Sequence, residues 1–416
     1  MLPLLLIALL AAVPAVAGVK TGIEVLEAQG FAPLKDKRVG LITNHTGVTP
    51  DYRRTIDLLA HAPGLRLTAI FTPEHGISGV RDDAHIESDR DEATGVPIYS
   101  LYNLSQPKPE KPEQGPLLGR QEEERGRRFR PTDEMMRDVD ALVYDIQDIG
   151  ARFYTYITTL GYMVEEAGRR KIPFYVLDRP NPVNGVAVEG PLLDEQYVSF
   201  VGYIPMPIRH GMTVGELARM YNGEKKLGAD VHVIQMEGWR RGQWMDETGL
   251  PWINPSPNMR SLVQAILYTG VCLLESRQVS VGRGTDTPFQ MVGAPWFKSA
   301  EMADYLNARR VPGVRFIARR FTPNASVFKD QQCEGVEVLL TDRKALKSVT
   351  AGLELVAAVL KMNPGKFDIA GIMRLLGNDA TAARLKAGDD PRQIAKSWKS
   401  GLKAFGELRA RYLLYK

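Results

Sequence analysis

Residues 139–160 read VDALVYDIQDIGARFYTYITTL, and they join the end of a strand to the start of a helix. Residues 141–146 form a short apolar run whose only charge is Asp145, which is typical of a buried strand in a parallel sheet. From Thr155, apolar residues recur at the spacing of an amphipathic helix that closes near Gly168. Ligands bind at the carboxyl edge of open α/β sheets, so we expect a site at this strand end. Its candidate residues are Asp145, Gln147, Asp148, Arg152 and Tyr154.

Three other short apolar runs, at 37–43, 65–71 and 173–177, also end in polar clusters. These clusters are Asn44-His45-Thr46-Gly47, Thr72-Pro73-Glu74-His75-Gly76 and Asp178-Arg179-Pro180-Asn181-Pro182. A helix is predicted over 55–60 and a further strand over 230–236. Strands that alternate with helices through right-handed crossovers form a doubly wound parallel sheet, which would bring the polar clusters to one edge.

The chain of 416 residues is longer than one hydrophobic core usually serves, so two domains are expected. We predict an N-terminal α/β domain over 18–240 and a smaller α+β domain over 241–416. Residues 103–131 are rich in Pro, Glu and Arg and predict a mobile surface insertion. Thr213 and Glu216 form a capping-box pattern, which favours a structural role for that glutamate.

In the second domain, the pattern predicts helices over 262–268 and 351–362, a strand over 335–341, and further helices from residue 369 to the end. The net charge of +4 is too weak to imply nucleic acid as a partner, although it tolerates an anionic substrate. Cys272 and Cys333 allow at most one disulfide, and neither has the neighbours of a metal motif.

Residues 1–17, MLPLLLIALLAAVPAVA, are apolar and end in a small-residue cleavage pattern at Ala15-Val16-Ala17. They are shorter than the ~20 residues of a spanning helix, which favours a signal peptide cleaved near Ala17. The segment lacks an early Lys or Arg, so a misplaced start codon and an uncleaved anchor remain alternatives. A periplasmic or secreted protein without a stable membrane span is the expectation.

Glu74 is the first candidate for a catalytic carboxylate. It follows a predicted buried strand, and Pro73 and Gly76 frame it in a tight turn, so it should project over the sheet edge. Partial burial at such an edge raises the pKa of a carboxyl group toward the range of a general acid. The alternatives are that Glu74 caps the next element or pairs with an arginine.

Asp145 and Asp148 are the other candidate catalytic groups, although Asp145 can equally form a buried ion pair with Arg152 or Arg179. An arginine suits a substrate carboxylate because its planar fork binds both oxygens, yet single arginines are more often internal braces. His45, His75 and His210 lack the spacing of metal ligands, so no metal and no cofactor are predicted. The chain also lacks a dinucleotide fingerprint and a GxSxG nucleophile motif.

The sequence blocks LITNHTGV, FTPEHGISG, YDIQDIGARFYTYITT, LDRPNPVNG, VEGPLL, IRHGMTVGELA, INPSPNM and SVGRGTDTPFQMVGAPW closely resemble the NamZ family of exo-β-N-acetylmuramidases. The resemblance runs from about residue 20 to the end of the chain. It implies a Rossmann-like N-terminal domain, a smaller C-terminal domain and an active site in the cleft between them. The implied activity is that of a glycosidase that releases terminal β-linked N-acetylmuramic acid from the non-reducing end of peptidoglycan fragments.

The family's proposed catalytic glutamate corresponds to Glu74. Further site candidates stand in the matching blocks: Asn44, His75, Asp145, Gln147, Asp148, Arg152, Tyr154, Arg179, Asn181, His210, Asn258 and Arg283. The insertion at 103–131 departs from the pattern that we expect of the family, and it bears on substrate length. Arg152, Arg179 and Arg283 are the candidates for binding the lactyl carboxylate of muramic acid.

Two rival functions remain at this point. One is a non-catalytic periplasmic protein that binds muropeptides or sugars, and the other is an amidase or esterase of the cell wall. The residues alone give neither the stereochemical outcome, nor the second catalytic group, nor the oligomeric state.

Overall fold

The computed structural model describes residues 18–80, 89–102 and 129–416. The N-terminal part is a seven-stranded sheet in the order β3-β4-β2-β1-β5-β6-β9. Its strands are β1 (Arg38–Thr43), β2 (Arg66–Thr72), β3 (Asp89–Arg90), β4 (Pro97–Ser100), β5 (Ala141–Asp145), β6 (Phe174–Leu177) and β9 (Val231–Ile234). All neighbouring pairs are parallel except β3 with β4. The chain leaves β1 toward β2 and later returns to β5 on the other side, so the doubly wound prediction is confirmed.

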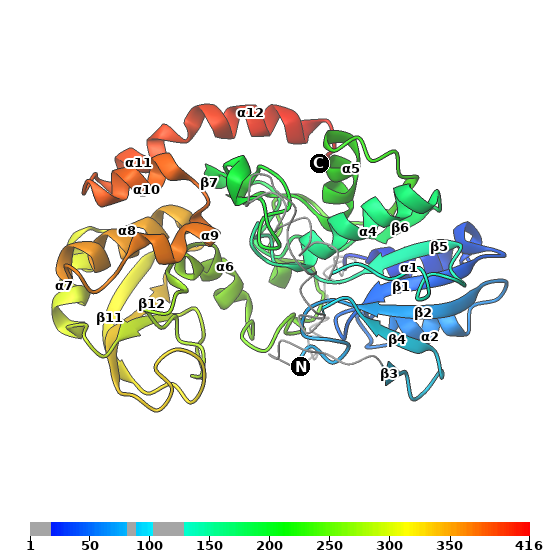
Figure 1. The fold of residues 1–416 in the computed structure, drawn as a ribbon, viewed down its shortest axis with the longest axis horizontal. Helices are drawn as coiled ribbons and strands as arrows, with labels where there is room; N and C mark the ends of the chain where they lie inside the picture. Colours follow the sequence, from blue (N-terminus) through cyan, green and yellow to red (C-terminus); the bar gives the residue numbers. More distant parts are fainter. Residues whose placement is uncertain (1–17, 81–88, 103–128) are drawn as a thin grey trace, which may run out of the picture.

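Helices cover both faces of this sheet (Figure 1). They are α1 (Gly22–Ala28), α2 (Thr55–Ala60), α4 (Tyr156–Arg170) and α5 (Val214–Glu224). Successive side chains of β5 point to opposite faces of the sheet, so both faces are apolar and covered by helices. Ala141 and Val143 join one apolar cluster, while Leu142 and Tyr144 join the other. The capping box of Thr213 and Glu216 is present at the start of α5, as predicted.

The C-terminal part holds a three-stranded antiparallel sheet in the order β10-β12-β11, packed on helices. Its strands are β10 (Met291–Ala294), β11 (Val314–Phe321) and β12 (Cys333–Leu340). Its helices are α6 (Leu262–Val271), α7 (Ser299–Ala308), α8 (Ser348–Met362), α9 (Met373–Leu376), α10 (Asp379–Lys386), α11 (Pro391–Ser397) and α12 (Lys399–Ala410). This arrangement confirms the predicted α+β class, although the sequence did not single out β10, β11 or α7.

Short elements complete the structure. They are the hairpin of β7 (Glu189–Leu192) and β8 (Pro207–Arg209), and the 3-10 turns η1 (Ala32–Leu34), η2 (Glu195–Tyr197), η3 (Met245–Glu247), η4 (Cys272–Leu274) and η5 (Ile369–Ile372). Helix α12 runs across the top of Figure 1 from α11 to the neighbourhood of α5, and the chain end packs on the N-terminal part. There the Tyr415 hydroxyl donates to Asp178 at 2.5 Å. One apolar cluster extends through both parts, so they pack as one body.

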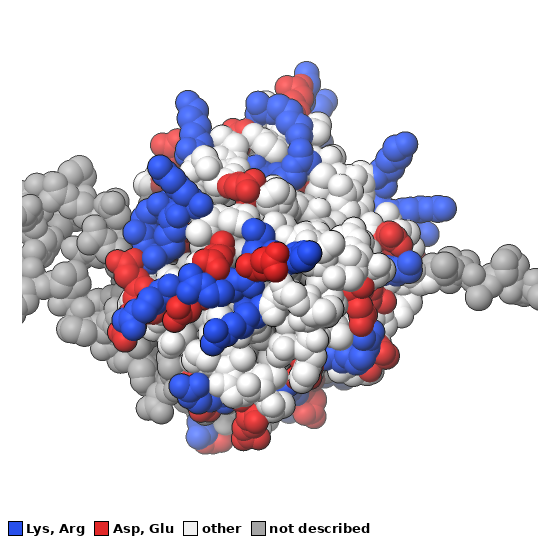
Figure 2. Space-filling view, turned by 90° about the vertical axis from the view of Figure 1, so that its right-hand side faces the viewer, with Lys and Arg blue, Asp and Glu red and all other residues white. Residues whose placement is uncertain are grey.

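On the outer face of the N-terminal part, basic and acidic side chains lie interleaved (Figure 2). Arg38 pairs with Asp138, and Arg53 pairs with Glu27. No helix within the described residues has the length and apolar character needed to cross a membrane. The predicted signal peptide, and residues 103–128 of the predicted insertion, lie outside the described residues.

Candidate active site

Glu74 stands where the sequence places it, in a tight turn directly after β2. The Gly76 N–H donates to the Pro73 carbonyl at 3.1 Å, and His75 takes a left-handed conformation with φ of 72°. The half-buried Glu74 accepts a hydrogen bond on Oε2 from the Thr155 hydroxyl at 2.6 Å. No ion pair reaches Glu74 from residues 18–80, 89–102 or 129–416. The alternative of an arginine partner for Glu74 is therefore not found in this part of the chain.

Glu74 faces a cleft of about 520 Å³ between the two parts of the molecule. This volume lies in the range of pockets that bind small ligands. Five of the predicted site residues line it, namely Glu74, His75, Tyr154, Asn258 and Arg283. The lining also includes Thr155 from the N-terminal part and Ser256, Tyr268, Glu275, Arg277 and Arg374 from the chain beyond β9.

Aromatic rings form one wall of the cleft. Tyr268 packs edge-on against Phe153, Tyr154 and Phe289, with ring centroids 4.6 to 5.9 Å apart. Burial raises the pKa of both Tyr154 and Tyr268 well above the usual value. Both hydroxyls therefore stay protonated at neutral pH and can donate hydrogen bonds.

The predicted catalytic residue Asp145 is not part of the cleft lining. It is fully buried, and Arg179 donates to both of its oxygens, at 2.5 and 3.0 Å. The Thr55 hydroxyl adds a third bond at 2.5 Å. These contacts correspond to the structural alternative for Asp145, and they also occupy Arg179, which was a candidate for the substrate carboxylate.

Asp148 and His210 form a second buried pair away from the cleft lining, with Asp148 Oδ2 3.9 Å from His210 Nε2. Burial raises the pKa of Asp148 to about 7 and lowers the pKa of His210 to about 3. Both side chains are therefore mainly neutral just below pH 7, and the contact is not an ion pair there. His210 Nδ1 accepts the Met212 N–H at 3.2 Å, which fixes the ring.

Arg152 is a buried brace and does not line the cleft. Its guanidinium donates to four backbone carbonyls, those of Pro191, Met206, Leu375 and Leu376, at 2.6 to 3.2 Å. Burial lowers its pKa to about 9. Because two of these carbonyls belong to α9, Arg152 ties the N-terminal part to that helix.

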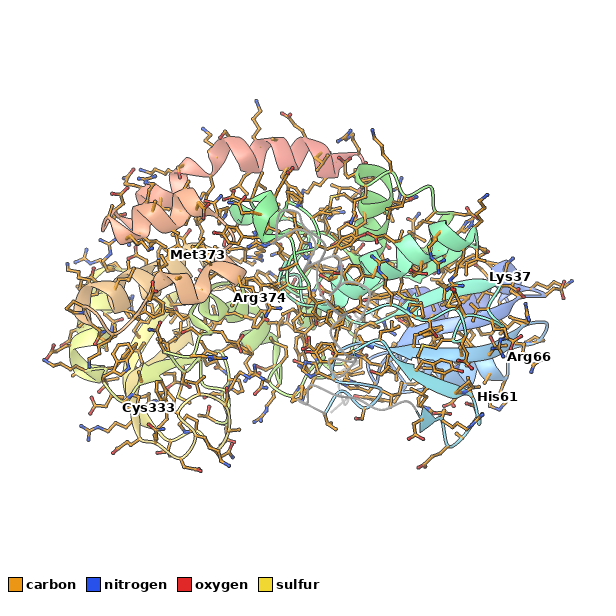
Figure 3. The ribbon with its side chains drawn as sticks, viewed as in Figure 1. Lys37, His61, Arg66, Cys333, Met373 and Arg374 are labelled. Carbon is orange, nitrogen blue, oxygen red and sulfur yellow. The ribbon has the colours of Figure 1, made fainter. Side chains whose placement is uncertain are left out.

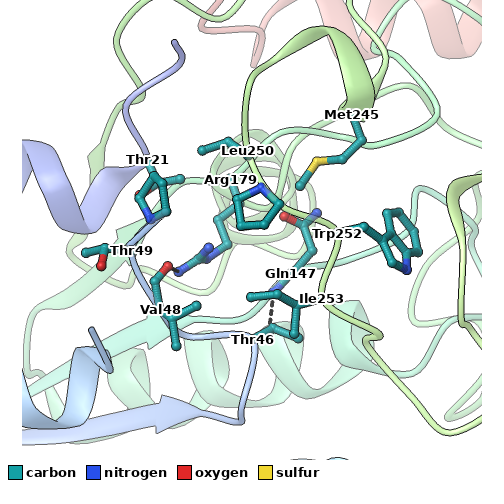
Figure 4. A pocket seen from close by; sticks show the side chains of 12 residues that line it. Thr21, Thr46, Val48, Thr49, Gln147, Arg179, Met245, Leu250, Trp252 and Ile253 are labelled. Atoms are coloured by element: carbon teal, nitrogen blue, oxygen red, sulfur yellow. Dashed lines mark hydrogen bonds between the residues drawn. The ribbon is translucent and has the colours of Figure 1, made fainter. Parts of the chain in front are cut away.

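The crevice at the switch point between β1 and β5 is filled. Gln147 and Arg179 line a pocket of about 20 Å³ there, and Leu250, Trp252 and Ile253 cover it (Figure 4). This volume holds about one water molecule and no sugar ring. In this structure Gln147 and Arg179 therefore have no room to bind substrate at this point.

The two predicted asparagines at strand ends also hold loops in place. Asn44 Oδ1 accepts the N–H and the hydroxyl of Thr46, at 2.9 and 2.6 Å. Asn181 donates to the Met212 carbonyl at 3.0 Å and accepts the Val183 N–H at 3.2 Å. Neither lines the cleft.

Sequence reasoning missed several cleft residues. Thr155 was assigned only to the start of a helix, and Arg374 lies in a four-residue helix, α9, that carries no motif. Glu275 and Arg277 follow the η4 turn and belong to no motif, so their charge was the only feature of the sequence that could have marked them as site residues. Among the described residues, no group of three or more His, Cys, Asp or Glu side chains is placed to hold a metal ion.

Comparison with known proteins places this geometry in a family. Residues 39–116 and 125–263 match the family model for "Exo-beta-N-acetylmuramidase NamZ, N-terminal", and residues 266–415 match the corresponding C-terminal model. Residues 117–124, which the N-terminal match leaves out, fall inside the predicted insertion. The seam between the two matches lies near residue 265, directly after the start of α6.

The "Peptidoglycan beta-N-acetylmuramidase NamZ" of Bacillus subtilis is 40% identical over 401 residues, which is 95% of this chain and 91% of that protein. Two crystal structures of DUF1343 family proteins from Bacteroides fragilis have the same fold. One has a TM-score of 0.79 and 36% identity, and the other 0.73 and 31%; each match covers 96% of this chain and 99% of the other. The chain therefore belongs to the NamZ family of exo-β-N-acetylmuramidases.

Proposed function

We propose that this protein is an exo-acting glycosidase that releases terminal β-linked N-acetylmuramic acid from the non-reducing end of peptidoglycan fragments, with Glu74 as its general acid. The observation that carries the role of Glu74 is its position: it faces the cleft from a rigid turn and has a hydroxyl, not a cation, as its partner. Family membership supports the substrate class.

Glycoside hydrolysis requires an acid that protonates the departing glycosidic oxygen. The Thr155 hydroxyl occupies Glu74 Oε2 and orients the carboxyl group, so Oε1 remains available to carry the proton. No cation among the described residues pairs with Glu74. Proton delivery by Glu74 therefore needs no rearrangement of an ion pair.

Cleavage of the glycosidic bond also requires a group that stabilises the positive charge developing on the sugar ring. Glu275 is a second carboxylate in the cleft lining, and it pairs with Arg283 at 2.7 Å. Asn258 and Ser256 supply amide and hydroxyl groups to the same cleft, and the acetamido group of the substrate requires such partners. The residues that line the cleft thus include a second carboxylate and partners for the acetamido group.

The test is incubation of the purified protein with a chromogenic β-N-acetylmuramide and, separately, with the matching β-N-acetylglucosaminide. Release from the muramide alone is the expected result. Tight binding of the muramide without release identifies a binding protein and overturns the proposal. Release of peptide or acyl groups from muropeptides, with intact glycosidic bonds, identifies an amidase or esterase instead.

We also propose that the protein is exported, to the periplasm or the medium, after cleavage near Ala17. The support is the apolar segment at 1–17 and its small-residue ending. Cell fractionation of the full chain, with N-terminal sequencing of the mature form, tests this. A cytoplasmic protein that retains Met1 contradicts it.

A further inference from the structure

Arg277 and Arg374 differ from the arginines that the sequence singled out. Both line the cleft that holds Glu74, and both are exposed. Across residues 18–80, 89–102 and 129–416, neither guanidinium has an ion pair or a hydrogen bond to a side chain or carbonyl. Arg283, in contrast, pairs with Glu275 in the same cleft. Two guanidinium groups are therefore available to a ligand.

The two segments that carry these arginines are tied together. The Asp368 N–H donates to the Gln278 side-chain oxygen at 3.0 Å, which joins the segment after Arg277 to the one before α9. Gly371 lies next to the same segment: a Cβ added at Gly371 would be 3.7 Å from Ser276 and 3.6 Å from Gln278. Arg277 and Arg374 thus extend from adjoining backbone segments.

Arg374 is also held in place from the N-terminal part. Buried Arg152 donates to the Leu375 and Leu376 carbonyls at 2.6 and 3.0 Å, directly after Arg374 in α9. Arg374 lies at the inner edge of the C-terminal part, toward the N-terminal part (Figure 3). The backbone of α9 is therefore fixed, while the side chain of Arg374 remains open to the cleft.

The charges of the cleft favour an anionic ligand. Glu275 and Arg283 neutralise each other, which leaves the carboxyl group of Glu74 with the guanidinium groups of Arg277 and Arg374. A guanidinium binds a carboxylate through two parallel hydrogen bonds, and it does so with more geometric specificity than a lysine.

N-acetylmuramic acid differs from N-acetylglucosamine by a lactyl ether that carries a carboxylate. We infer that Arg374, together with Arg277, binds this carboxylate and sets the specificity of the cleft for muramic acid. The inference rests on the proposed function, because that function supplies the substrate. Arg374 and Arg277 thus take the role that the sequence suggested for Arg152 and Arg179, because the donors of those two arginines are occupied inside the protein.

The test compares Arg374→Gln and Arg277→Gln with the unmodified protein. Loss of one charge-assisted hydrogen bond should lower kcat/KM for the chromogenic muramide by about 10- to 150-fold, mainly through KM. The inhibition constant of free N-acetylmuramic acid should rise by a similar factor in Arg374→Gln. The inhibition constant of N-acetylglucosamine should not change, because that sugar has no carboxylate.

Arg66→Gln is the matched control, because Arg66 is equally exposed but lies at the far end of the N-terminal part (Figure 3). It should change none of these constants. The inference is overturned if binding of N-acetylmuramic acid is unchanged in both cleft variants, or if N-acetylglucosamine binding weakens as much. Calorimetry measures the binding of N-acetylmuramic acid to each variant without any turnover. If the unmodified protein releases no sugar, the proposed function fails, and the calorimetric comparison still tests the role of the two arginines.

Discussion

Two charged regions of this molecule differ in what their side chains contact. At the edge where β1 and β5 end, Asp145 and Arg179 bind each other and neighbouring groups inside the protein. In the cleft, Glu74 has one hydroxyl partner, and the guanidinium of Arg374 has no ion pair or hydrogen bond among the described residues. Asp145, Arg179 and Glu74 each follow a parallel strand of the same sheet, whereas Arg374 comes from α9 of the C-terminal part.

The difference lies in the chain that covers each region. At the switch point, the segment around Leu250 to Ile253 closes the crevice to about 20 Å³, so the charges there must find internal partners. At the end of β2, the C-terminal part leaves about 520 Å³ open. The rule that places ligands at the switch point therefore points to the edge of the sheet where the open cleft lies, but the open space is at the end of β2 and not at the switch point.

The largest expected effect tests the cleft. Glu74→Gln keeps the size of the side chain and an acceptor for Thr155, but it cannot deliver a proton. We expect kcat to fall about 10²- to 10⁴-fold on an unactivated muramic acid disaccharide, while the melting temperature and substrate affinity stay the same. If the variant keeps more than about a tenth of the original kcat, Glu74 is not the general acid.

The second prediction concerns the buried ion pair of Asp145 and Arg179, and it is measured as stability and not as activity. Asp145→Asn removes the charge that compensates buried Arg179, so we expect a loss of about 3–5 kcal/mol in the free energy of unfolding. Urea denaturation measures it. Asp138→Asn is the matched control: its partner Arg38 lies at the surface, where an ion pair contributes about 0–1 kcal/mol. If the two variants lose the same free energy of unfolding, the buried pair contributes no more to stability than the exposed pair, and the prediction is wrong.

A third test uses pH. The pKa of Asp148 is raised from 3.8 to about 7, so between these values the unfolded chain releases a proton that the folded protein keeps. The contribution of Asp148 to stability is therefore full below about pH 4 and is lost as pH rises through about 7. Asp148→Asn has no such loss.

Relative to the unmodified protein, Asp148→Asn should gain at least about 1 kcal/mol in the free energy of unfolding between pH 4 and pH 7, and then remain constant. His210 has the reverse dependence, since its lowered pKa removes stability as pH falls from 6.5 toward about 3. This term is common to both proteins and cancels in the difference. Urea melts of both proteins across the range measure the difference, and a flat difference would show that Asp148 ionises normally.

Local patterns carried enough information for the fold. The apolar run at 141–146 and the helix after Thr155 correspond to β5 and α4, and the Thr213 capping box starts α5. These features depend on neighbours in sequence, so the sequence alone could predict them. Glu74 was also predictable, because Pro73 and Gly76 define its turn.

The partners of the arginines were not predictable in the same way. Arg152 binds carbonyls 39 to 224 positions away along the chain, and no local pattern encodes such a contact. Arg374 lies in a helix of four residues, which is too short for hydrophobic periodicity to identify. Which arginine is buried and which is open depends on how the two parts pack together.

The smallest expected effect concerns the contact that places Glu74. Thr155→Val keeps the shape of the side chain but removes the hydroxyl that donates to Glu74 Oε2 at 2.6 Å, so the carboxyl group gains freedom to rotate. Loss of one hydrogen bond should lower kcat by about 2- to 12-fold, well below the effect of Glu74→Gln, and Thr155→Ser should restore most of it. Because Thr155 precedes α4 without capping it through its side chain, the melting temperature should change little. Steady-state kinetics of the three proteins decide the matter: if the serine variant is as slow as the valine variant, the hydroxyl does not orient Glu74, and only the turn at 73–76 does.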